Sequence, residues 1–226
     1  YNNCSKTFKK KNLYWNSIET LDSKEGPLFD VVFCNNDCRL LNIVNAKKKY
    51  VFSHSLQSVE KFIRKKQLVP YLKNKPTFLL LGKYHKKNRS KIISLFGSKI
   101  ISYAVDDIFI NKKLHQNIDH NLAIFTSRQD RNLEMLINIW KKYIYEKKKD
   151  AKLFITPITD NSLEKYNIFS RNMIDQRNLV DDLSKSRMML VPGHKAELFC
   201  LSAEEAKELC LPIVTLGIGS LSERVE

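Results

Sequence analysis

Two carboxylates stand eight positions apart in the segment ELFCLSAEEA, at Glu197 and Glu205. Between them lies an apolar stretch of Phe199, Cys200 and Leu201. Carboxylates bind vicinal hydroxyls well, because each oxygen accepts one O–H. The free N–H groups at the start of a helix bind phosphate. The segment therefore predicts a site for a polyol or a sugar diphosphate.

Each of the two acids has a different alternative. Ser202 stands three residues before Glu205, which is the spacing of a capping box, so reciprocal capping of the helix is the other interpretation of Glu205. Glu197 follows VPGHKA, a predicted strand end and turn. A carboxylate there, beside the start of a helix, favours contact with a ligand.

A second polar loop, SRQDRN at 127–132, carries Arg128 and Arg131. It follows a predicted strand and leads into a helix, and two guanidiniums at the start of a helix form an anion site. The alternative is that Asp130 neutralises one arginine and that both are ordinary surface residues. The spacing alone does not separate these two interpretations.

No metal site is predicted. The cysteines are odd in number and contain no C-x-x-C pair, so neither a disulfide framework nor a zinc site is indicated. A metal held by Cys34 and Cys38 is disfavoured because no histidine pair lies near them, and reduced cysteines of a cytoplasmic protein are expected. We interpret Asp106 and Asp107 as a turn between domains, and no D-x-D stands where it would hold a metal.

Short apolar runs alternate with amphipathic stretches along the chain. The runs read as buried strands because they are rich in β-branched or aromatic residues and stop at polar ones. Predicted strands are 29–34, 50–55, 77–82, 99–105, 121–127, 151–158, 166–170, 187–193 and 212–217, and predicted helices are 56–68, 87–96, 131–145, 176–186 and 203–210.

This alternation predicts an α/β fold with parallel sheets and helices on both faces. The pattern starts again after residue 119, so two domains are expected, at 1–118 and 119–226, joined near the polar stretch 111–121. Ligands of open α/β sheets bind beyond the carboxyl ends of the strands. The loops 127–131 and 192–202 both lie there.

The chain has 226 residues, is 43% hydrophobic and carries a net charge of +15. No run of about 18 apolar residues could span a membrane, and no signal peptide is visible. The lysines are spread along the chain, which indicates an ordinary solvated surface together with a lysine-rich bias of the source genome. Docking of this surface on anionic lipid is the alternative. A nucleic-acid-binding protein is disfavoured, because no aromatic–basic recognition motif appears. We expect a fragment, since the chain starts at Tyr1 without a methionine.

Four blocks in order resemble the retaining GT-B glycosyltransferases of group 1. ELFCLSAEEAKELCLPIVT resembles their E-x7-E segment, and FTSRQDRNLEMLINIW their strand, phosphate loop and helix. NIFSRNMIDQRNLVDDLSKSRMMLVPG and GIGSLSERV resemble the flanking elements. The resemblance covers residues 99–226. The sequence departs from the family pattern where Leu198, Cys200 and Cys210 replace glycines, which puts the identity of the sugar in doubt.

The resemblance implies two Rossmann-like domains of the GT-B type, both incomplete here. It implies that Glu205 holds the nucleotide ribose and Glu197 the transferred sugar. Backbone amides at 199–201 would face the phosphate or sugar, and Arg128 and Arg131 would offset the leaving diphosphate. The resemblance also implies that His54, after a predicted strand, is the histidine that the first domain points at the donor sugar. The alternative is that His54 is a polar residue at the end of a strand.

The implied activity is transfer of a hexose from a UDP-, GDP- or ADP-sugar to a glycan or lipid-linked acceptor, with retention and without metal or cofactor. By resemblance the setting is cell-envelope biosynthesis such as that of lipopolysaccharide, in the cytoplasm or at the inner face of the membrane. A sugar-nucleotide epimerase of the same architecture is the main alternative, and it would need an acid/base set that the sequence does not show clearly.

Overall fold

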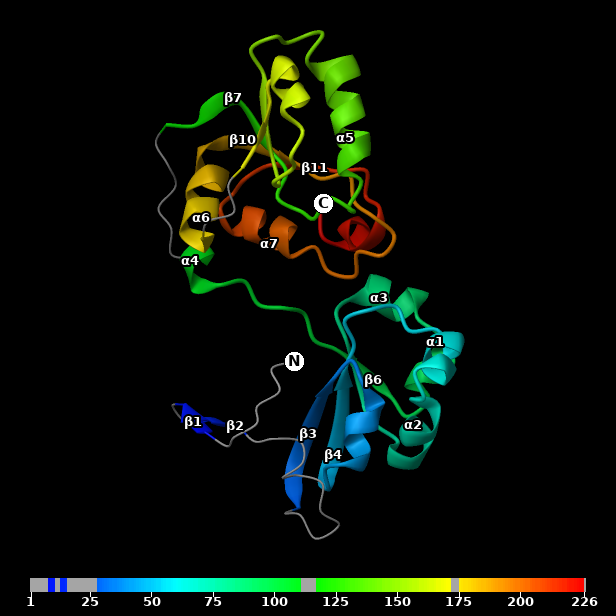
Figure 1. Ribbon diagram of the computed structural model, residues 1–226. Coiled ribbons are helices and arrows are strands. Elements are labelled where there is room, and N and C mark those ends of the chain that lie inside the picture. The colour runs from blue at the N-terminus through cyan, green and yellow to red at the C-terminus, as the bar shows by residue number, and fades with distance from the viewer. Residues whose placement is uncertain (1–7, 11–12, 16–27, 111–116, 172–174, 226) are drawn as a thin grey trace. The chain divides into compact units, whose positions relative to one another are not determined.

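The computed structural model describes residues 8–10, 13–15, 28–110, 117–171 and 175–225 (Figure 1). The chain forms two compact units. The first unit runs to Leu81 and continues through His85–Ile101, and the second comprises Gly82–Tyr84 and Ser102–Glu226. The predicted join at 111–121 falls partly on residues 111–116, outside the described residues. The domain limits 1–118 and 119–226 therefore stay a prediction.

The first unit contains a four-stranded parallel sheet in the order β3-β4-β5-β6. Its buried core gathers side chains such as Phe62, Tyr71, Phe78 and Ile93 between the sheet and its helices. The elements of this part of the chain are β1 (Phe8–Lys10), β2 (Leu13–Trp15), β3 (Phe29–Asn35), η2 (Cys38–Asn42), β4 (Ala46–Phe52), α1 (Val59–Arg64), α2 (Leu68–Asn74), β5 (Thr77–Leu80), α3 (Lys83–Asn88), η3 (Lys91–Ser94) and β6 (Ser98–Ile100).

The second unit contains a five-stranded parallel sheet in the order β11-β10-β7-β8-β9. The chain steps outward from β7 to β9 and then returns to place β10 on the other side of β7. The elements are α4 (Asp107–Ile110), β7 (Asp119–Ile124), α5 (Leu133–Ile139), π-helix η4 (Trp140–Ile144), β8 (Lys152–Ile155), η5 (Asn161–Tyr166), β9 (Ile168–Ser170), α6 (Gln176–Lys185), β10 (Ser186–Leu190), α7 (Leu201–Glu208), β11 (Ile213–Val214) and η6 (Gly219–Glu223).

Helices cover both faces of this second sheet. One core cluster lies between the sheet and α4, α6 and α7, and a second lies between the sheet and the α5–η5 side. On the second side, Trp140 is buried and its indole Nε1 donates to the carbonyl of Tyr166 at 2.9 Å. Both sheets are parallel, which confirms the predicted fold class of Rossmann-like units.

The structure corrects several element predictions. The strand predicted at 99–105 is wrong beyond Ile100, where β6 ends. The strand predicted at 29–34 forms, but most of β3 is exposed and not buried. The helix predicted at 87–96 is wrong, because α3 ends at Asn88 and a separate 3-10 turn occupies 91–94. The helix α2 was not predicted. Pro70 lies in the first turn of α2, where a missing N–H costs nothing. Among the described residues, no helix is both long and apolar enough to cross a bilayer.

Candidate functional site

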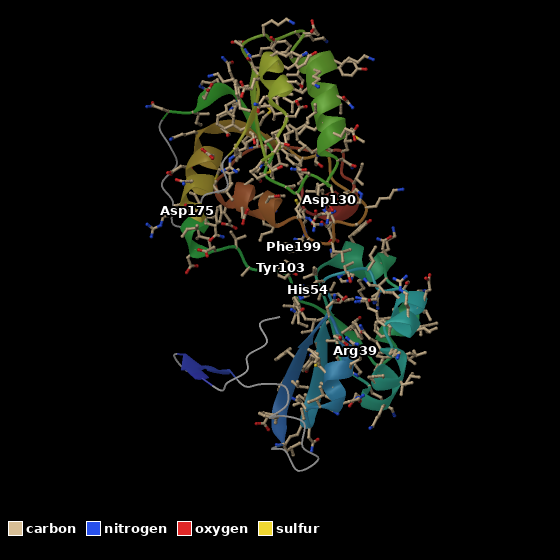
Figure 2. All side chains as sticks on the ribbon, in the orientation of Figure 1. Arg39, His54, Tyr103, Asp130, Asp175 and Phe199 are labelled. Atoms are coloured by element: carbon tan, nitrogen blue, oxygen red, sulfur yellow. The ribbon has the colours of Figure 1, made fainter. Side chains whose placement is uncertain are left out.

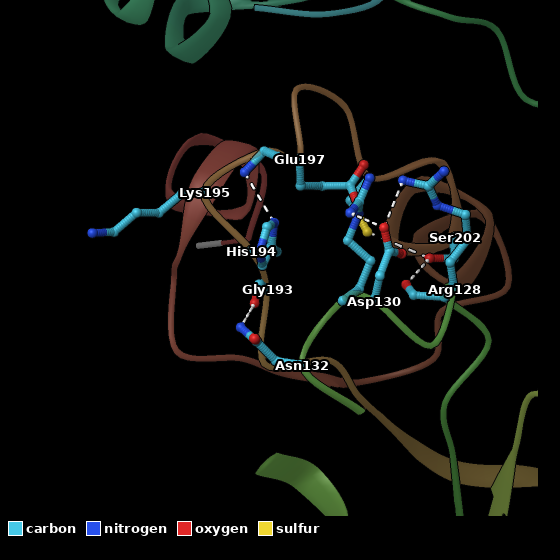
Figure 3. Close-up of polar contacts among 12 residues, drawn as sticks. Arg128, Asp130, Asn132, Gly193, His194, Lys195, Glu197 and Ser202 are labelled. Atoms are coloured by element: carbon cyan, nitrogen blue, oxygen red, sulfur yellow. Dashed lines mark hydrogen bonds and ion pairs between the residues drawn. The ribbon is translucent and has the colours of Figure 1, made fainter. Parts of the chain in front are cut away.

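The loops that follow β7 and β10 meet at the carboxyl end of the second sheet (Figure 3). The hydroxyls of Ser127 and Ser202 lie 2.9 Å apart and link the loop after β7 to the first turn of α7. The side chain of Asn132 donates to the carbonyl of Gly193. Because the strand order reverses between β7 and β10, this is the place where open α/β sheets bind ligands.

Arg131 and Glu197 form an ion pair in this site. The Arg131 Nε donates to Glu197 Oε2 at 2.7 Å, and the two side chains are only 11% and 18% exposed. The same guanidinium also donates to Asp130 Oδ2 at 2.8 Å. The structure therefore brings together one acid and one arginine that lie 66 positions apart in the sequence.

Arg128 differs from Arg131 in its surroundings. Its side chain is 70% exposed, and its guanidinium lies 3.3 Å from Asp130 Oδ2. Asp130 thus pairs with both arginines. The alternative interpretation of this loop expected it to neutralise one of them. Only Arg128 is a surface residue, however, because Arg131 is enclosed between Asp130 and Glu197.

Two tight backbone contacts fix the segment that carries Glu197. The N–H of Glu197 donates to the carbonyl of His194, and the carbonyl of Glu197 accepts from the N–H of Ser220, both at 2.9 Å. Burial raises the pKa of the Glu197 carboxyl above its usual value, and the charge of Arg128 opposes this rise. Glu197 is therefore a positioned acid whose charged state depends on its cationic neighbours.

Glu205 does not act in a capping box. The helix α7 begins at Leu201 with Cys200 as its N-cap, and no side chain caps it. Ser202 contacts Ser127 and the Cys200 thiol instead. The reciprocal capping that was the alternative interpretation of Glu205 is therefore wrong.

Glu205 is instead a buried acid without a protein partner. Its residue is 7% exposed, and within the described parts of the chain its carboxylate makes no hydrogen bond or ion pair. Burial raises the pKa of this carboxyl, and the nearby charge of Asp106 raises it further. Its carboxylate oxygens are not among the fully enclosed polar atoms without a partner, so water reaches them, and the hydroxyls of a ligand can take the place of that water.

The apolar segment between the two acids packs inward. Phe199 and Cys200 are 6% and 2% exposed, whereas Leu201 is 39% exposed. Leu198 is also buried, and the Cys200 side chain joins the core under α7. The substituents that replace two glycines of the family pattern thus lie within the packed interior.

Two residues that the sequence did not single out hold Phe199. The guanidinium of Arg224 lies 3.7 Å from the centre of its ring. The ring of Tyr103 packs edge-on, with the two ring centres 5.1 Å apart; both residues are labelled in Figure 2. Arg224 also pairs with Glu204 at 3.0 Å. No local motif marks these contacts, because the three segments are distant in the sequence.

His54 belongs to the first unit, just beyond the end of β4. Its backbone N–H donates to Asn36 Oδ1 at 3.4 Å, and its ring packs on Phe52 at 4.6 Å. Burial lowers the pKa of the imidazole. The neutral form is therefore favoured near neutral pH.

The described residues include no group of three or more His, Cys, Asp or Glu side chains that could hold a metal. Cys34 and Cys38 are buried free thiols, and burial raises the pKa of these groups to about 11 and about 12. Asp106 accepts from the N–H of Ile108 at 3.0 Å and so starts α4.

No protein-family model matches this sequence, and no curated protein matches it either. Solved structures do match. TarM superposes with a TM-score of 0.66 at 16% identity, covering 95% of this chain and 48% of that one. The pneumococcal O-GlcNAc transferase GtfA in complex with UDP and GlcNAc gives 0.64 at 12%, covering 97% and 49%.

Sucrose-phosphate synthase from Thermosynechococcus elongatus gives a TM-score of 0.59 at 15% identity, covering 86% of this chain and 57% of that one. The chain thus spans about half the length of the structures that it matches. At these identities the likeness establishes the fold. The chain has the α/β architecture of GT-B proteins, with two Rossmann-like units.

Proposed function

We propose that this chain is part of a glycosyltransferase that moves a sugar from a nucleotide-sugar donor to a glycan or lipid-linked acceptor. The observation that carries the proposal is Glu205, an acid 7% exposed that has no hydrogen bond or ion pair among the described residues. It lies on α7, the helix that begins directly after the segment carrying Glu197, the partner of Arg131. A pair of acids beside arginines and the start of α7 suits a molecule with both hydroxyls and phosphates. The shared fold with a transferase solved with UDP and GlcNAc supports the same conclusion.

Each site residue receives a role in this proposal. Glu205 accepts hydrogen bonds from the ribose hydroxyls, and Glu197 from those of the transferred sugar. Arg131 holds Glu197 in place, since their contact already exists in the protein. The exposed Arg128 binds the diphosphate together with backbone amides at 199–201. His54 contributes from the first unit, as the family resemblance implies.

The chemistry follows from where charge develops. When the bond between the anomeric carbon and the phosphate oxygen breaks, positive charge builds on the sugar and negative charge on the leaving diphosphate. A guanidinium close to the leaving diphosphate stabilises that negative charge. Arg128 supplies it, so the proposed reaction proceeds without a metal. Retention at the anomeric carbon is part of the proposal on the strength of the family resemblance.

A thermal-shift experiment on the whole chain tests the donor site. UDP, GDP or ADP at about 100 times its Kd should stabilise the protein by about 2.7 kcal/mol. Glu205→Gln should abolish this shift. The same change should leave the ligand-free melting temperature equal or higher, because it removes a buried carboxylate whose raised pKa shows that its charge is disfavoured by the fold.

Glu208→Gln is the matched control, since Glu208 is exposed on the same helix and should keep the full shift. The donor-site assignment fails if no nucleotide raises the melting temperature of the folded wild-type chain. Product analysis with a responding UDP-sugar then separates the two activities. Release of UDP supports transfer or donor hydrolysis. A UDP-sugar whose sugar is epimerised at another carbon supports the epimerase.

A further inference from the structure

The outer helical layer of the first unit has a surface that the proposed function does not use. The helices α1, α2 and the 3-10 turn η3 lie next to one another (Figure 1). The rings of Phe62 in α1 and Tyr71 in α2 pack edge to face, with their centres 5.7 Å apart. The Tyr71 hydroxyl donates to the carbonyl of Ile92 at 2.8 Å and accepts from the N–H of Leu95 at 2.9 Å. These contacts make one continuous layer, the α1–α2–η3 surface.

Large aliphatic side chains project outward from this layer. Buried residues such as Phe62, Tyr71 and Ile93 face the sheet. Their neighbours in the sequence face solvent, namely Ile63 at 57% exposed, Val69 at 73%, Leu72 at 48%, Ile92 at 57% and Leu95 at 68%. Single exposed apolar residues are ordinary, but five on three adjacent segments indicate an interaction surface.

The same surface is strongly basic. Residues 58–75 and 85–95 contain ten Lys and Arg residues and one acid, Glu60. Within the described part of the chain, one ion pair forms inside these segments, between Arg64 and Glu60 at 3.9 Å. Burial and the neighbouring charges of Lys65 and Arg64 lower the pKa of Lys61. The positive charges therefore repel one another and lack an acidic complement of their own.

We propose that the α1–α2–η3 surface docks on a lipid bilayer that contains anionic headgroups. Basic side chains around exposed aliphatic ones match such a bilayer, because the cations meet the headgroups while the aliphatic groups enter the boundary with the acyl chains. A nucleic acid would pair the same charges with stacked aromatic side chains. The five exposed side chains here are aliphatic, which favours the lipid surface.

Flotation with lipid vesicles tests this docking on the whole chain. The protein should float with vesicles of phosphatidylcholine and phosphatidylglycerol in a 7:3 ratio, and it should stay behind with pure phosphatidylcholine. Lys65→Glu/Lys73→Glu/Lys91→Glu should weaken partitioning by about 100-fold or more, because each basic residue near an anionic surface contributes about fivefold. Lys147→Glu/Lys148→Glu/Lys149→Glu makes the same charge change in the second unit and should have a much smaller effect.

A second pair of variants separates lipid from a generic polyanion. Val69→Ser/Leu95→Ser keeps the charge but removes two exposed aliphatic groups, and it should weaken vesicle binding about tenfold. Val214→Ser/Leu216→Ser removes two similarly exposed groups from the second unit and should not. Far-ultraviolet circular dichroism establishes that every variant is folded.

Three results would overturn the proposal. The first is equal partitioning onto neutral and anionic vesicles. The second is the same loss from both lysine triples, which would reduce the effect to net charge. The third is wild-type vesicle binding by Val69→Ser/Leu95→Ser together with tighter binding of the wild type to single-stranded DNA than to vesicles, which would assign the surface to nucleic acid. Each readout is independent of nucleotide binding at the second unit, so the donor-site proposal is tested separately.

Discussion

Arg131 and Arg128 lie three residues apart, yet they have opposite surroundings. Arg131 is 11% exposed between Asp130 and Glu197, whereas Arg128 is 70% exposed. Arg131→Ala should lower the free energy of unfolding by about 2 kcal/mol, because it leaves the partly buried Glu197 without its counter-charge. Arg128→Ala should change it by less than about 0.5 kcal/mol. Urea unfolding followed by tryptophan fluorescence in a Trp15→Phe background, where Trp140 alone reports, measures both. Equal losses would contradict this assignment.

The same two arginines mark the limit of prediction at this scale. The sequence places Asp130 beside both of them, so it predicts local neutralisation. It does not reveal that Glu197, 66 positions away, takes the Nε of Arg131, because that contact depends on how two loops meet at the sheet. The sequence also does not show that Glu205 has no hydrogen-bond or ion-pair partner within the parts of the chain that the structure describes, because that depends on packing.

A buried histidine should make the first unit sensitive to acid. His85 is fully buried, and burial together with Arg89 lowers the pKa of its imidazole to about 4, against about 6.5 in the unfolded chain. Below about pH 6.5 the His85 imidazole is protonated in the unfolded chain, whereas in the folded chain it stays neutral until about pH 4. Stability should therefore be complete above pH 6.5 and fall by about 3 kcal/mol as the pH drops towards 4.

Amide hydrogen exchange of β5 at a series of pH values measures this loss within the first unit. His85→Gln should flatten the pH dependence between 4 and 6.5, whatever it does to the absolute stability. His120→Gln, at an exposed position of the second unit, should leave the slope unchanged. An unaltered slope in His85→Gln would assign the acid sensitivity to another group.

At the scale of elements, Gly219 lets two loops of the site approach each other, and Gly217 is its matched control. Gly219 has φ +75°, and a Cβ there would lie 2.2 Å from the carbonyl oxygen of His194. Gly217 has a similar φ of +66°, but a Cβ there would meet nothing within 4 Å. Gly217→Ala should therefore cost only the conformational strain, about 1 kcal/mol.

Gly219→Ala adds a backbone collision to that strain and should displace the segment that carries Glu197. We expect an additional loss of about 2 kcal/mol or more and a nucleotide-induced thermal shift that is strongly reduced. The comparison of the two alanine variants by thermal shift isolates the collision. If both variants behave alike, then close approach of the loops is not what holds Glu197.

Strands were predictable at the element scale because buried parallel strands are short apolar runs, as in β5 and the second half of β7. Helix limits were less predictable. The helix α7 begins at Leu201, after the N-cap residue Cys200. The S-x-x-E pattern at Ser202 and Glu205 would have predicted a later start. Tertiary contacts decided the cap, and the local motif did not.

At the scale of the whole molecule, the hydrophobic clusters do not cross between the units. The two clusters of the second unit contain only residues from 105 onward, and the cluster of the first unit contains only residues between 32 and 96. Each unit therefore buries its own apolar surface, which is the main source of folding free energy. The alternation of strands and helices predicted this division, although sequence patterns do not fix its boundary to a residue.

A fragment of residues 102–226 should consequently fold alone. It holds the five-stranded sheet, both of its core clusters and the Arg131–Glu197 and Glu205 groups. We expect a cooperative thermal transition by circular dichroism. We also expect the same preference among UDP, GDP and ADP as in the whole chain, with weaker affinity if the first unit contributes contacts. A fragment of residues 28–101, which lacks the proposed donor site, is the control and should show no nucleotide-induced shift. The fragment 102–226 could instead melt cooperatively but bind no nucleotide that the whole chain recognises. That result would mean that the second unit does not contain the complete donor site. The roles proposed for Glu205 and Arg128 would then require residues of the first unit.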